Sequence, residues 1–226
     1  MINKTFLDHL KDGQTIAISG IDSSYYPKGL INIISESKIK NLTLIYIENN
    51  AEFDPEGDPM KLILNGQVKK LITSHLGYMA KTYKDYLEDI ELLPMDILAF
   101  KMQASANKLP GIVVDREYAE LYRNAEWIES HSFESSSENG IFVFEPSFDI
   151  DVGVILADEY DPKSKNCHWN GTAYNCQDVA RAAKLSIVEY MNEYSSTPDT
   201  ADLPGQYVDI AIKSNSNIYK KTNWEE

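Results

Sequence analysis

Residues 12–21 have the sequence Asp12-Gly13-Gln14-Thr15-Ile16-Ala17-Ile18-Ser19-Gly20-Ile21 and contain the first apolar run of the chain. The run is rich in isoleucine and has glycine on both sides, which predicts a buried strand at residues 15–19. Pro27 follows where a helix can begin, because proline is favoured at the first helical position. A strand followed directly by a helix indicates the first unit of a parallel sheet.

The alternation of strands and helices continues along the chain. Apolar runs rich in β-branched residues predict further strands at residues 42–47, 70–74, 142–144, 152–156 and 208–212. Helical patterns are found at residues 58–65, where Gly66 ends the helix, and at 80–88 and 177–184. The sequence therefore predicts an α/β fold with a mostly parallel sheet flanked by helices.

The chain is long enough for one such domain. Its 226 residues, 43% of them apolar, can bury a full core. We expect a single α/β domain at residues 1–214, to which a short lobe can be attached, and a polar tail at 215–226. No apolar run approaches the roughly 18 residues of a membrane helix, and the N-terminus does not resemble a signal peptide, so we expect a cytoplasmic protein without membrane contact.

The net charge and the two cysteines argue against a nucleic-acid-binding protein, a disulfide-linked protein and a metalloprotein. The net charge is −14, and Lys and Arg do not cluster, which argues against a nucleic-acid partner. Cys167 and Cys176 are too few for a disulfide framework and fit a reducing compartment, where we expect buried or incidental thiols. With His168 they make only a weak zinc pattern, so no bound metal is expected.

Five segments of the chain occur in the same order as in one enzyme family. They are residues 12–21, 47–51, 65–77, 180–184 and 203–209, the last reading Leu-Pro-Gly-Gln-Tyr-Val-Asp. In this order they resemble the α-type subunit of the two-subunit, family I coenzyme A transferases, which include the 3-oxoacid, acetate and glutaconate enzymes. The resemblance implies the fold of the CoA-transferase α-type chain, of the NagB/RpiA/CoA-transferase-like class.

The resemblance also implies a reaction. Enzymes of this family move coenzyme A from an acyl-CoA to a small carboxylic acid through a glutamyl-CoA thioester. The nucleophilic glutamate belongs to the β-type subunit, within a Ser-Glu-Asn-Gly motif after an early strand, and the coenzyme A thioester is a substrate rather than a permanently bound cofactor. We therefore expect a heteromer with a β-type partner and no nucleophile in this chain.

Two groups of residues match the family's crevice. Those implied to bind substrate or coenzyme A are Ser19, Gly20, Ile21 and Met95, and those at the partner's catalytic position are Glu48, Asn49 and Asn50. Glu48 stands one residue before the position that matches the nucleophile. Because side chains alternate at the end of a strand, this offset favours a structural or supporting role over a reacting carboxylate.

Ser137-Glu138-Asn139-Gly140 spells the motif of the β-type subunit, but at another place in the chain. Asn-Gly before an apolar run is a strong hairpin signal, so a turn is favoured over catalysis. His75, just after a predicted strand, is the histidine with a plausible crevice position, although a structural role is favoured for it.

Two departures from the family keep other functions open. The family's Gly-Gly-Phe is replaced by Ser19-Gly20-Ile21, and its Pro-Gln-Gly-Thr, whose glutamine donates to the oxyanion, by Pro94-Met95-Asp96-Ile97. Methionine has no hydrogen to donate, and losing one such donor costs about a hundred- to a thousandfold in rate. The alternatives are a CoA-thioester hydrolase or decarboxylase of the same fold, and a non-catalytic subunit. The family branch and the acyl group stay open.

Overall fold

The computed structural model describes residues 5–20, 25–47, 57–76, 83, 85–122, 132–133, 142–171, 174–194 and 201–215. Within these residues an eight-stranded sheet has the order β11-β10-β8-β1-β2-β3-β4, with β9 paired to β8 outside this row. Its strands are β1 (Thr15–Ile18), β2 (Leu42–Ile45), β3 (Val68–Thr73), β4 (Asp89–Leu92), β8 (Val152–Tyr160), β9 (Cys167–His168), β10 (Leu185–Glu193) and β11 (Ile210–Lys213). All pairs except β8 with β9 are parallel, which confirms the predicted sheet.

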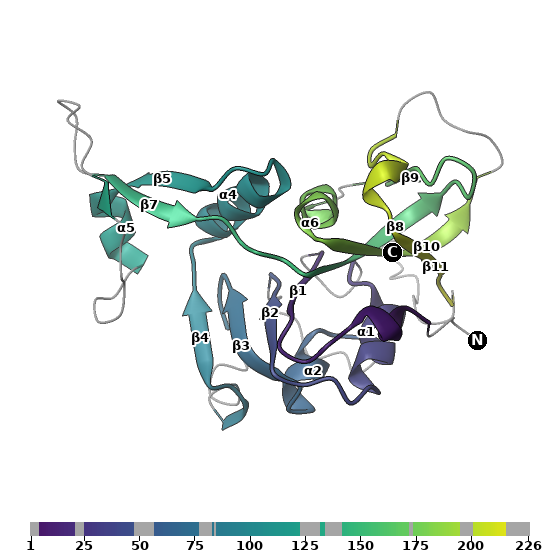
Figure 1. The fold of residues 1–226 in the computed structure, drawn as a ribbon, viewed down its shortest axis with the longest axis horizontal. Coiled ribbons are helices and arrows are strands. Elements are labelled where there is room, and N and C mark those ends of the chain that lie inside the picture. The colour runs from purple at the N-terminus through teal and green to yellow at the C-terminus, as the bar shows by residue number, and fades with distance from the viewer. Residues whose placement is uncertain are drawn as a thin grey trace, which may run out of the picture.

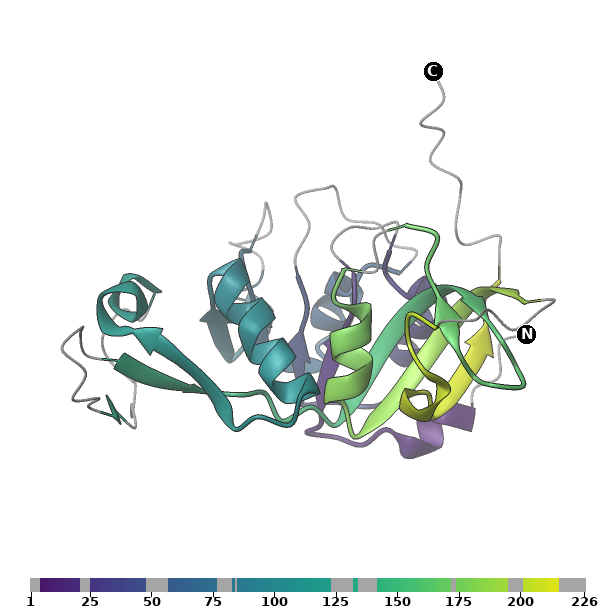
Figure 2. The ribbon, with the colours of Figure 1, turned by 90° about the horizontal axis from the view of Figure 1, so that it is seen from above.

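Helices cover both faces of this sheet (Figure 1). The helical segments on one face are η1 (Thr5–His9), α1 (Lys28–Ser35) and α2 (Met60–Leu64), and those on the other are α4 (Met95–Ala106) and α6 (Cys176–Ala182). Figure 2 shows α4 and α6 side by side on their face. In β1, Ile16 and Ile18 pack with the first group and Ala17 packs with the second. The run is apolar throughout because both of its faces are buried.

A second sheet forms a lobe that extends from the α4 side of the molecule (Figure 1). It is antiparallel, has the order β5-β7-β6, and consists of β5 (Gly111–Asp115), β6 (Ser132–Phe133) and β7 (Phe142–Pro146), with α5 (Arg116–Tyr122) after β5. The buried ion pair between Lys101 of α4 and Glu145 of β7, at 3.7 Å, joins the lobe to the main body. The strand predicted at residues 142–144 is therefore present, but in this lobe rather than in the parallel sheet.

Most other predicted elements are present with shifted ends. The expected strands at 15–19, 42–47, 70–74, 152–156 and 208–212 are β1, β2, β3, β8 and β11, and the expected helices after Pro27, at 58–65 and at 177–184 are α1, α2 and α6. Gly66, after α2, has a φ of +67°, a conformation that favours glycine. In the helix predicted at 80–88, the described residues Tyr83, Asp85 and Tyr86 are helical. The sequence did not predict the strands β4, β5, β6, β9 and β10 or the helices α4 and α5.

Some predictions concern residues outside the described ranges. The turn at Asn139-Gly140 is one of them, although the strands on either side of it, β6 and β7, pair antiparallel. The tail at 215–226 is described only at residue 215, and the boundary at residue 214 stays a prediction. Among the described helices, none is both long and apolar enough to cross a membrane.

Candidate functional site

The order of the strands reverses at β1. The strands β2, β3 and β4 follow on one side of β1, whereas β8, β10 and β11 lie on the other. In open parallel sheets, ligands bind outside the carboxyl ends of the strands at such a reversal. Because β1 ends at Ile18, Ser19 and Gly20 lie at this point. The topology therefore supports the two residues as candidates for ligand binding.

Gly20 has a backbone conformation that requires glycine. Its φ is +103°, and an added Cβ would lie 2.8 Å from the carbonyl oxygen of Tyr25. The Gly20 N–H donates a 3.1 Å hydrogen bond to Oδ1 of Asn175, the residue before α6. This bond joins the loop after β1 to the start of a helix that is far away in the sequence.

Two tyrosines stand close in sequence to the residues that form this hydrogen bond, Tyr25 after Gly20 and Tyr174 before Asn175. Tyr25 and Tyr174 meet edge to face, with 5.1 Å between their ring centroids. Tyr174 is exposed and has a φ of +44°. Asn175 and Tyr174 were not predicted as site residues, and no sequence signal relates them to Gly20. Tyr25 could have been suspected, because it stands near the place of a glycine in the family pattern.

Ser19 is completely buried, and its N–H donates a 3.0 Å hydrogen bond to the carbonyl of Val154. Cys176, the first residue of α6, is close to its hydroxyl. Burial raises the pKa of Cys176 to about 12, and the hydroxyl of Ser19 offsets only part of this effect. Cys176 is therefore a neutral thiol rather than a nucleophile near neutral pH. Because the side chain of Ser19 has no exposed surface, its role in ligand binding stays a prediction.

The carboxyl end of β2 is tied to the loop after β1. The Tyr26 hydroxyl donates a 2.7 Å hydrogen bond to the backbone carbonyl of Ile47. The candidates that follow directly, Glu48, Asn49 and Asn50, lie outside the described residues, as does Ile21. The anchor before residues 48–50 is therefore described, whereas the three candidate side chains remain predictions.

Met95 is the first residue of α4 and is 45% exposed. It follows β4, which is three strands away from β1, so at about 4.8 Å per strand roughly 14 Å separates the two strand ends. The structure therefore places Met95 and Gly20 three strands apart along one row of strand ends rather than in contact. His75, which follows β3, belongs to the same row. Its Nδ1 is buried and has no hydrogen-bond partner among the described residues.

The model of the coenzyme A transferase family matches residues 1–214. The chain belongs to the coenzyme A transferase family. It is 31% identical over 210 residues to the acetoacetyl-CoA:acetate/butyrate CoA transferase alpha subunit of Clostridium acetobutylicum, which covers 90% of this chain and 92% of that protein. The family assignment predicted from the ordered segments is confirmed.

Solved structures share the fold of this coenzyme A transferase chain. The glutaconate coenzyme A-transferase of Acidaminococcus fermentans is similar with a TM-score of 0.74 and 21% identity, over 95% of this chain and 74% of that one. A variant of the decarboxylase AibA/AibB is similar with a TM-score of 0.79 and 18% identity, over 95% of this chain and 82% of that one. The fold therefore occurs in proteins with different names and does not by itself identify the reaction.

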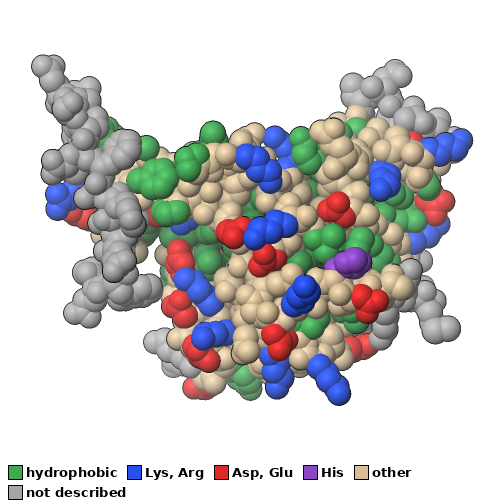
Figure 3. Space-filling view, viewed as in Figure 1, with side chains coloured by type: hydrophobic (Ala, Val, Ile, Leu, Met, Phe, Trp, Pro, Cys, Tyr) green, Lys and Arg blue, Asp and Glu red, His purple; other side chains and the backbone are tan. Residues whose placement is uncertain are grey.

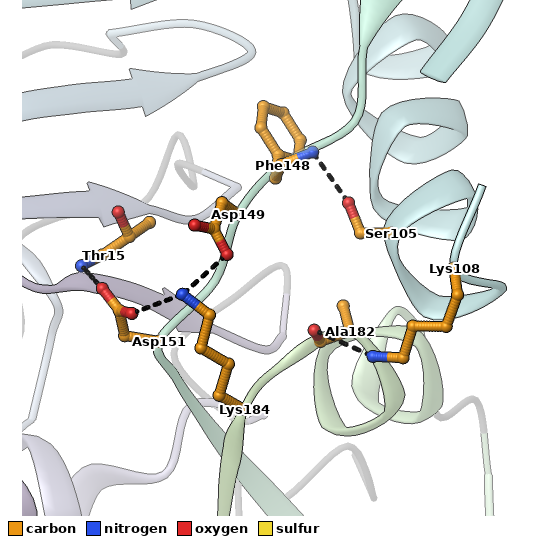
Figure 4. A network of polar contacts seen from close by, with 8 residues as sticks. All are labelled: Thr15, Ser105, Lys108, Phe148, Asp149, Asp151, Ala182 and Lys184. Carbon is orange, nitrogen blue, oxygen red and sulfur yellow. Dashed lines mark hydrogen bonds and ion pairs between the residues drawn. The ribbon is translucent and has the colours of Figure 1, made fainter. Parts of the chain in front are cut away.

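The fourth matched segment of this coenzyme A transferase chain has a structural role. Its last residue, Lys184, contacts Oδ1 of Asp149 at 2.8 Å and Oδ1 of Asp151 at 2.9 Å. The other oxygen of Asp151 accepts the Thr15 N–H at 2.9 Å, and nearby Lys108 donates to the end of α6 (Figure 4). These contacts lie where β1, β8 and β10 begin, at the opposite edge of the sheet from the candidate crevice.

The two cysteines of this coenzyme A transferase chain are buried free thiols, as predicted. Burial is the largest cause that raises the pKa of Cys167, as of Cys176, to about 12. No cluster of three or more His, Cys, Asp or Glu side chains in the described part of the chain could hold a metal ion.

Proposed function

We propose that this chain is the α-type subunit of an enzyme that moves coenzyme A between an acyl-CoA and a small carboxylic acid, with the nucleophilic glutamate supplied by a β-type subunit. The observation that carries the proposal is the family match over residues 1–214. A relative named as an alpha subunit, matched over 92% of its own length, supports the subunit type. The acyl group and the family branch are left open.

The reaction is nucleophilic catalysis by a carboxylate. The partner's glutamate attacks the thioester carbonyl, so that coenzyme A leaves as a thiolate and an acyl anhydride forms. The thiolate then attacks the glutamyl carbonyl, which releases the first acid and forms a glutamyl-CoA thioester. The second acid reverses these steps and leaves as the new acyl-CoA. Each addition creates an oxyanion, which must be stabilised by nearby hydrogen-bond donors.

In this proposal the α-type chain supplies one wall of the crevice. Gly20 at the reversal of strand order allows a close approach of the backbone. Its N–H donates to Asn175, and Tyr174, the residue before Asn175, meets Tyr25 of the loop after β1 edge to face. Residues 48–50 follow the anchored carbonyl of Ile47. Glu48 is assigned a supporting role, because it is offset by one residue from the position that matches the nucleophile.

The presence of methionine at position 95 favours a second candidate function. Its thioether occupies the position where the acetoacetate and succinate branch has an amide donor, and it cannot donate a hydrogen bond. Backbone N–H groups in the first turn of a helix have no partner within the helix, so the start of α4 can supply a replacement donor. Without such a replacement, hydrolysis or decarboxylation of a CoA thioester is the alternative.

The test uses the chain together with a purified β-type subunit that carries Ser-Glu-Asn-Gly. Acyl-CoA is added to the complex, followed by borohydride, and the partner's active-site peptide is analysed by mass spectrometry. We expect reduction of the glutamate only after addition of acyl-CoA, together with exchange of coenzyme A between two carboxylic acids. Thioester loss without a reducible glutamate would support hydrolysis or decarboxylation, and a stable complex without turnover would support a non-catalytic subunit.

A further inference from the structure

A groove lies between α4 and the lobe. Its cavity of about 470 Å³ is lined on one side by α4 and on the other by β5 and Tyr118 of α5. Three apolar side chains of its lining, Phe100, Leu109 and Val113, are 51–54% exposed. Figure 3 shows hydrophobic side chains gathered over α4 and β5 in the upper left of the view. Large exposed apolar side chains that share one groove are typical of an interaction surface.

The groove is held in shape by polar contacts around it. The Tyr118 hydroxyl donates a 2.6 Å hydrogen bond to Oδ2 of Asp96, which connects α5 to α4 across the groove. The carboxylate of Asp115 accepts the backbone N–H groups of Glu117 and Tyr118 at the start of α5. A surface fixed in this way loses little conformational freedom when a partner binds.

The charge of the groove limits what can occupy it. Its ionisable lining residues are the carboxylates Asp96 and Asp115 and the phenol of Tyr118, and no Lys, Arg or His is among its described lining residues. In a twofold symmetric contact between two copies of the chain, the same acidic patch would meet itself. The charge therefore favours a different protein that places an apolar side chain between Lys or Arg residues.

The lining of the groove begins one residue after Met95, a candidate crevice residue. Asp96 in its lining directly follows Met95, the exposed first residue of α4. A partner that brings a reacting carboxylate to the crevice next to Met95 therefore reaches the groove along α4. This step rests on the proposed function, in which the carboxylate belongs to the β-type subunit.

We infer that the groove between α4, β5 and α5 is a docking surface for the β-type subunit, which inserts an apolar side chain flanked by basic residues. The variants Phe100→Glu and Val113→Glu place a charge in the groove at exposed positions. Tyr86→Glu is the matched control, because Tyr86 is 45% exposed and is not part of the lining. Folding of each variant is checked by its thermal unfolding curve.

Binding is measured by calorimetry with the purified β-type subunit that carries Ser-Glu-Asn-Gly. We expect each groove variant to raise the Kd about 30-fold or more, as at a binding hot spot, and the control to stay within about threefold of wild type. Hydrogen exchange should be slowed by the partner at α4, β5 and α5. Wild-type binding by both groove variants, with slowed exchange elsewhere, overturns the surface and leaves the proposed function intact.

A second set of variants tests the charge of the occupant. In Asp115→Asn the side-chain oxygen that accepts the N–H groups of α5 is retained, so the variant removes charge with little change in structure. We expect slower association than wild type at low salt and no difference at high salt. Asp209→Asn is the control, since Asp209 also accepts a backbone N–H and lies on β11's side of the sheet. Equal rates for both variants contradict a basic occupant.

Two further outcomes overturn the inference. If the chain alone self-associates and Phe100→Glu abolishes the association, the occupant is a second copy. If the wild-type chain shows no binding to the β-type subunit, the docking surface and the two-subunit function fail together.

Discussion

The phenol of Tyr26 donates a 2.7 Å hydrogen bond to the backbone carbonyl of Ile47, and both residues are buried. The Tyr26 ring meets the ring of Tyr46 edge to face, and the Tyr46 hydroxyl lies 3.0 Å from the hydroxyl of Tyr83. The loop after β1 is thereby joined to the end of β2 just before residues 48–50. These tyrosines fix the chain at the point where it enters the candidate crevice.

Tyr26→Phe tests this connection. The substitution keeps the ring and leaves the buried carbonyl of Ile47 without the phenol, which we expect to lower the free energy of unfolding by about 1–3 kcal/mol. We also expect a lower kcat in the assembled enzyme, measured at a temperature where the variant is fully folded. Tyr25→Phe is the control for stability, since the Tyr25 side chain is only partly buried. Equal stability of the two variants would show that the hydrogen bond contributes nothing.

Gly20→Ala tests the backbone approach at the reversal of strand order. The φ of +103° and the carbonyl of Tyr25 at 2.8 Å from an added Cβ both oppose a side chain, so we expect a loss of about 1–3 kcal/mol in unfolding free energy. Gly13→Ala is the matched control, because Gly13 has a φ of +80° but no atom within 4 Å of the added Cβ. Urea denaturation compares the two, and an equal loss in both would argue against the close contact at Gly20.

The parts of the fold that were predicted are those with a local signal. The β1 and β2 runs are short, apolar and rich in β-branched residues, and Pro27 and Gly66 mark the start and the end of helices. In contrast, α4 was missed because apolar and polar residues are not separated onto two faces of the helix. Phe100 is 51% exposed whereas the adjacent Lys101 is buried, so the sequence pattern does not show which side faces solvent.

β10 was missed for a related reason. Ser186 and Glu189 are completely or almost completely buried within it, and polar residues interrupt the apolar run that a central parallel strand normally shows. Oε2 of Glu189 accepts the N–H of Leu30 in α1, a contact between residues far apart in the chain. The hydrogen bond from Gly20 to Asn175 also could not be predicted, because its two residues are far apart in the sequence. Sequence patterns report local preference, whereas these contacts depend on how the strands are ordered.

Asp151→Asn tests the contacts where β1, β8 and β10 begin. Partial burial raises the pKa of Asp151, but the N–H of Thr15 and the ammonium of Lys184 outweigh it, and the pKa lies below the ordinary 3.8. The folded state therefore binds this proton more weakly than the unfolded chain. Ionised Asp151 stabilises the fold above the ordinary pKa, and this contribution is lost as pH falls through the folded-state pKa.

We therefore expect wild type to be more stable than Asp151→Asn near neutral pH, and the difference to shrink below about pH 4. Urea denaturation over a pH series measures it. Asp149→Asn is the control, because Asp149 contacts the same Lys184 but its side chain is 83% exposed. A difference that does not change with pH would contradict the role of the ionised carboxylate.

The ion pair of Lys101 and Glu145 can be tested by a double-mutant cycle. Both side chains are more than nine-tenths buried. Lys101→Met takes the ammonium away from the buried carboxylate of Glu145, which still accepts the Tyr122 hydroxyl at 3.0 Å, and we expect this variant alone to cost about 1–3 kcal/mol. The double variant Lys101→Met with Glu145→Gln should cost less than the sum of the two single variants. Arg116→Ala breaks the exposed pair with Glu120 and serves as a control, with an expected cost of less than about 0.5 kcal/mol. Additive effects in the buried pair would contradict the coupling.

The position of β1 between β2 and β8 affects the synthesis of the protein. Ile16 pairs with Leu44 soon after both leave the ribosome, but its other partner, Val152, is made much later. Until then one edge of β1 has unpaired N–H and C=O groups, which are a template for pairing with other chains. Pairings between residues far apart in the sequence also form slowly. Nascent chains in which β8 has not yet been synthesised are therefore the most prone to aggregate, and the unpaired edge of β1 is where a chaperone would protect them most.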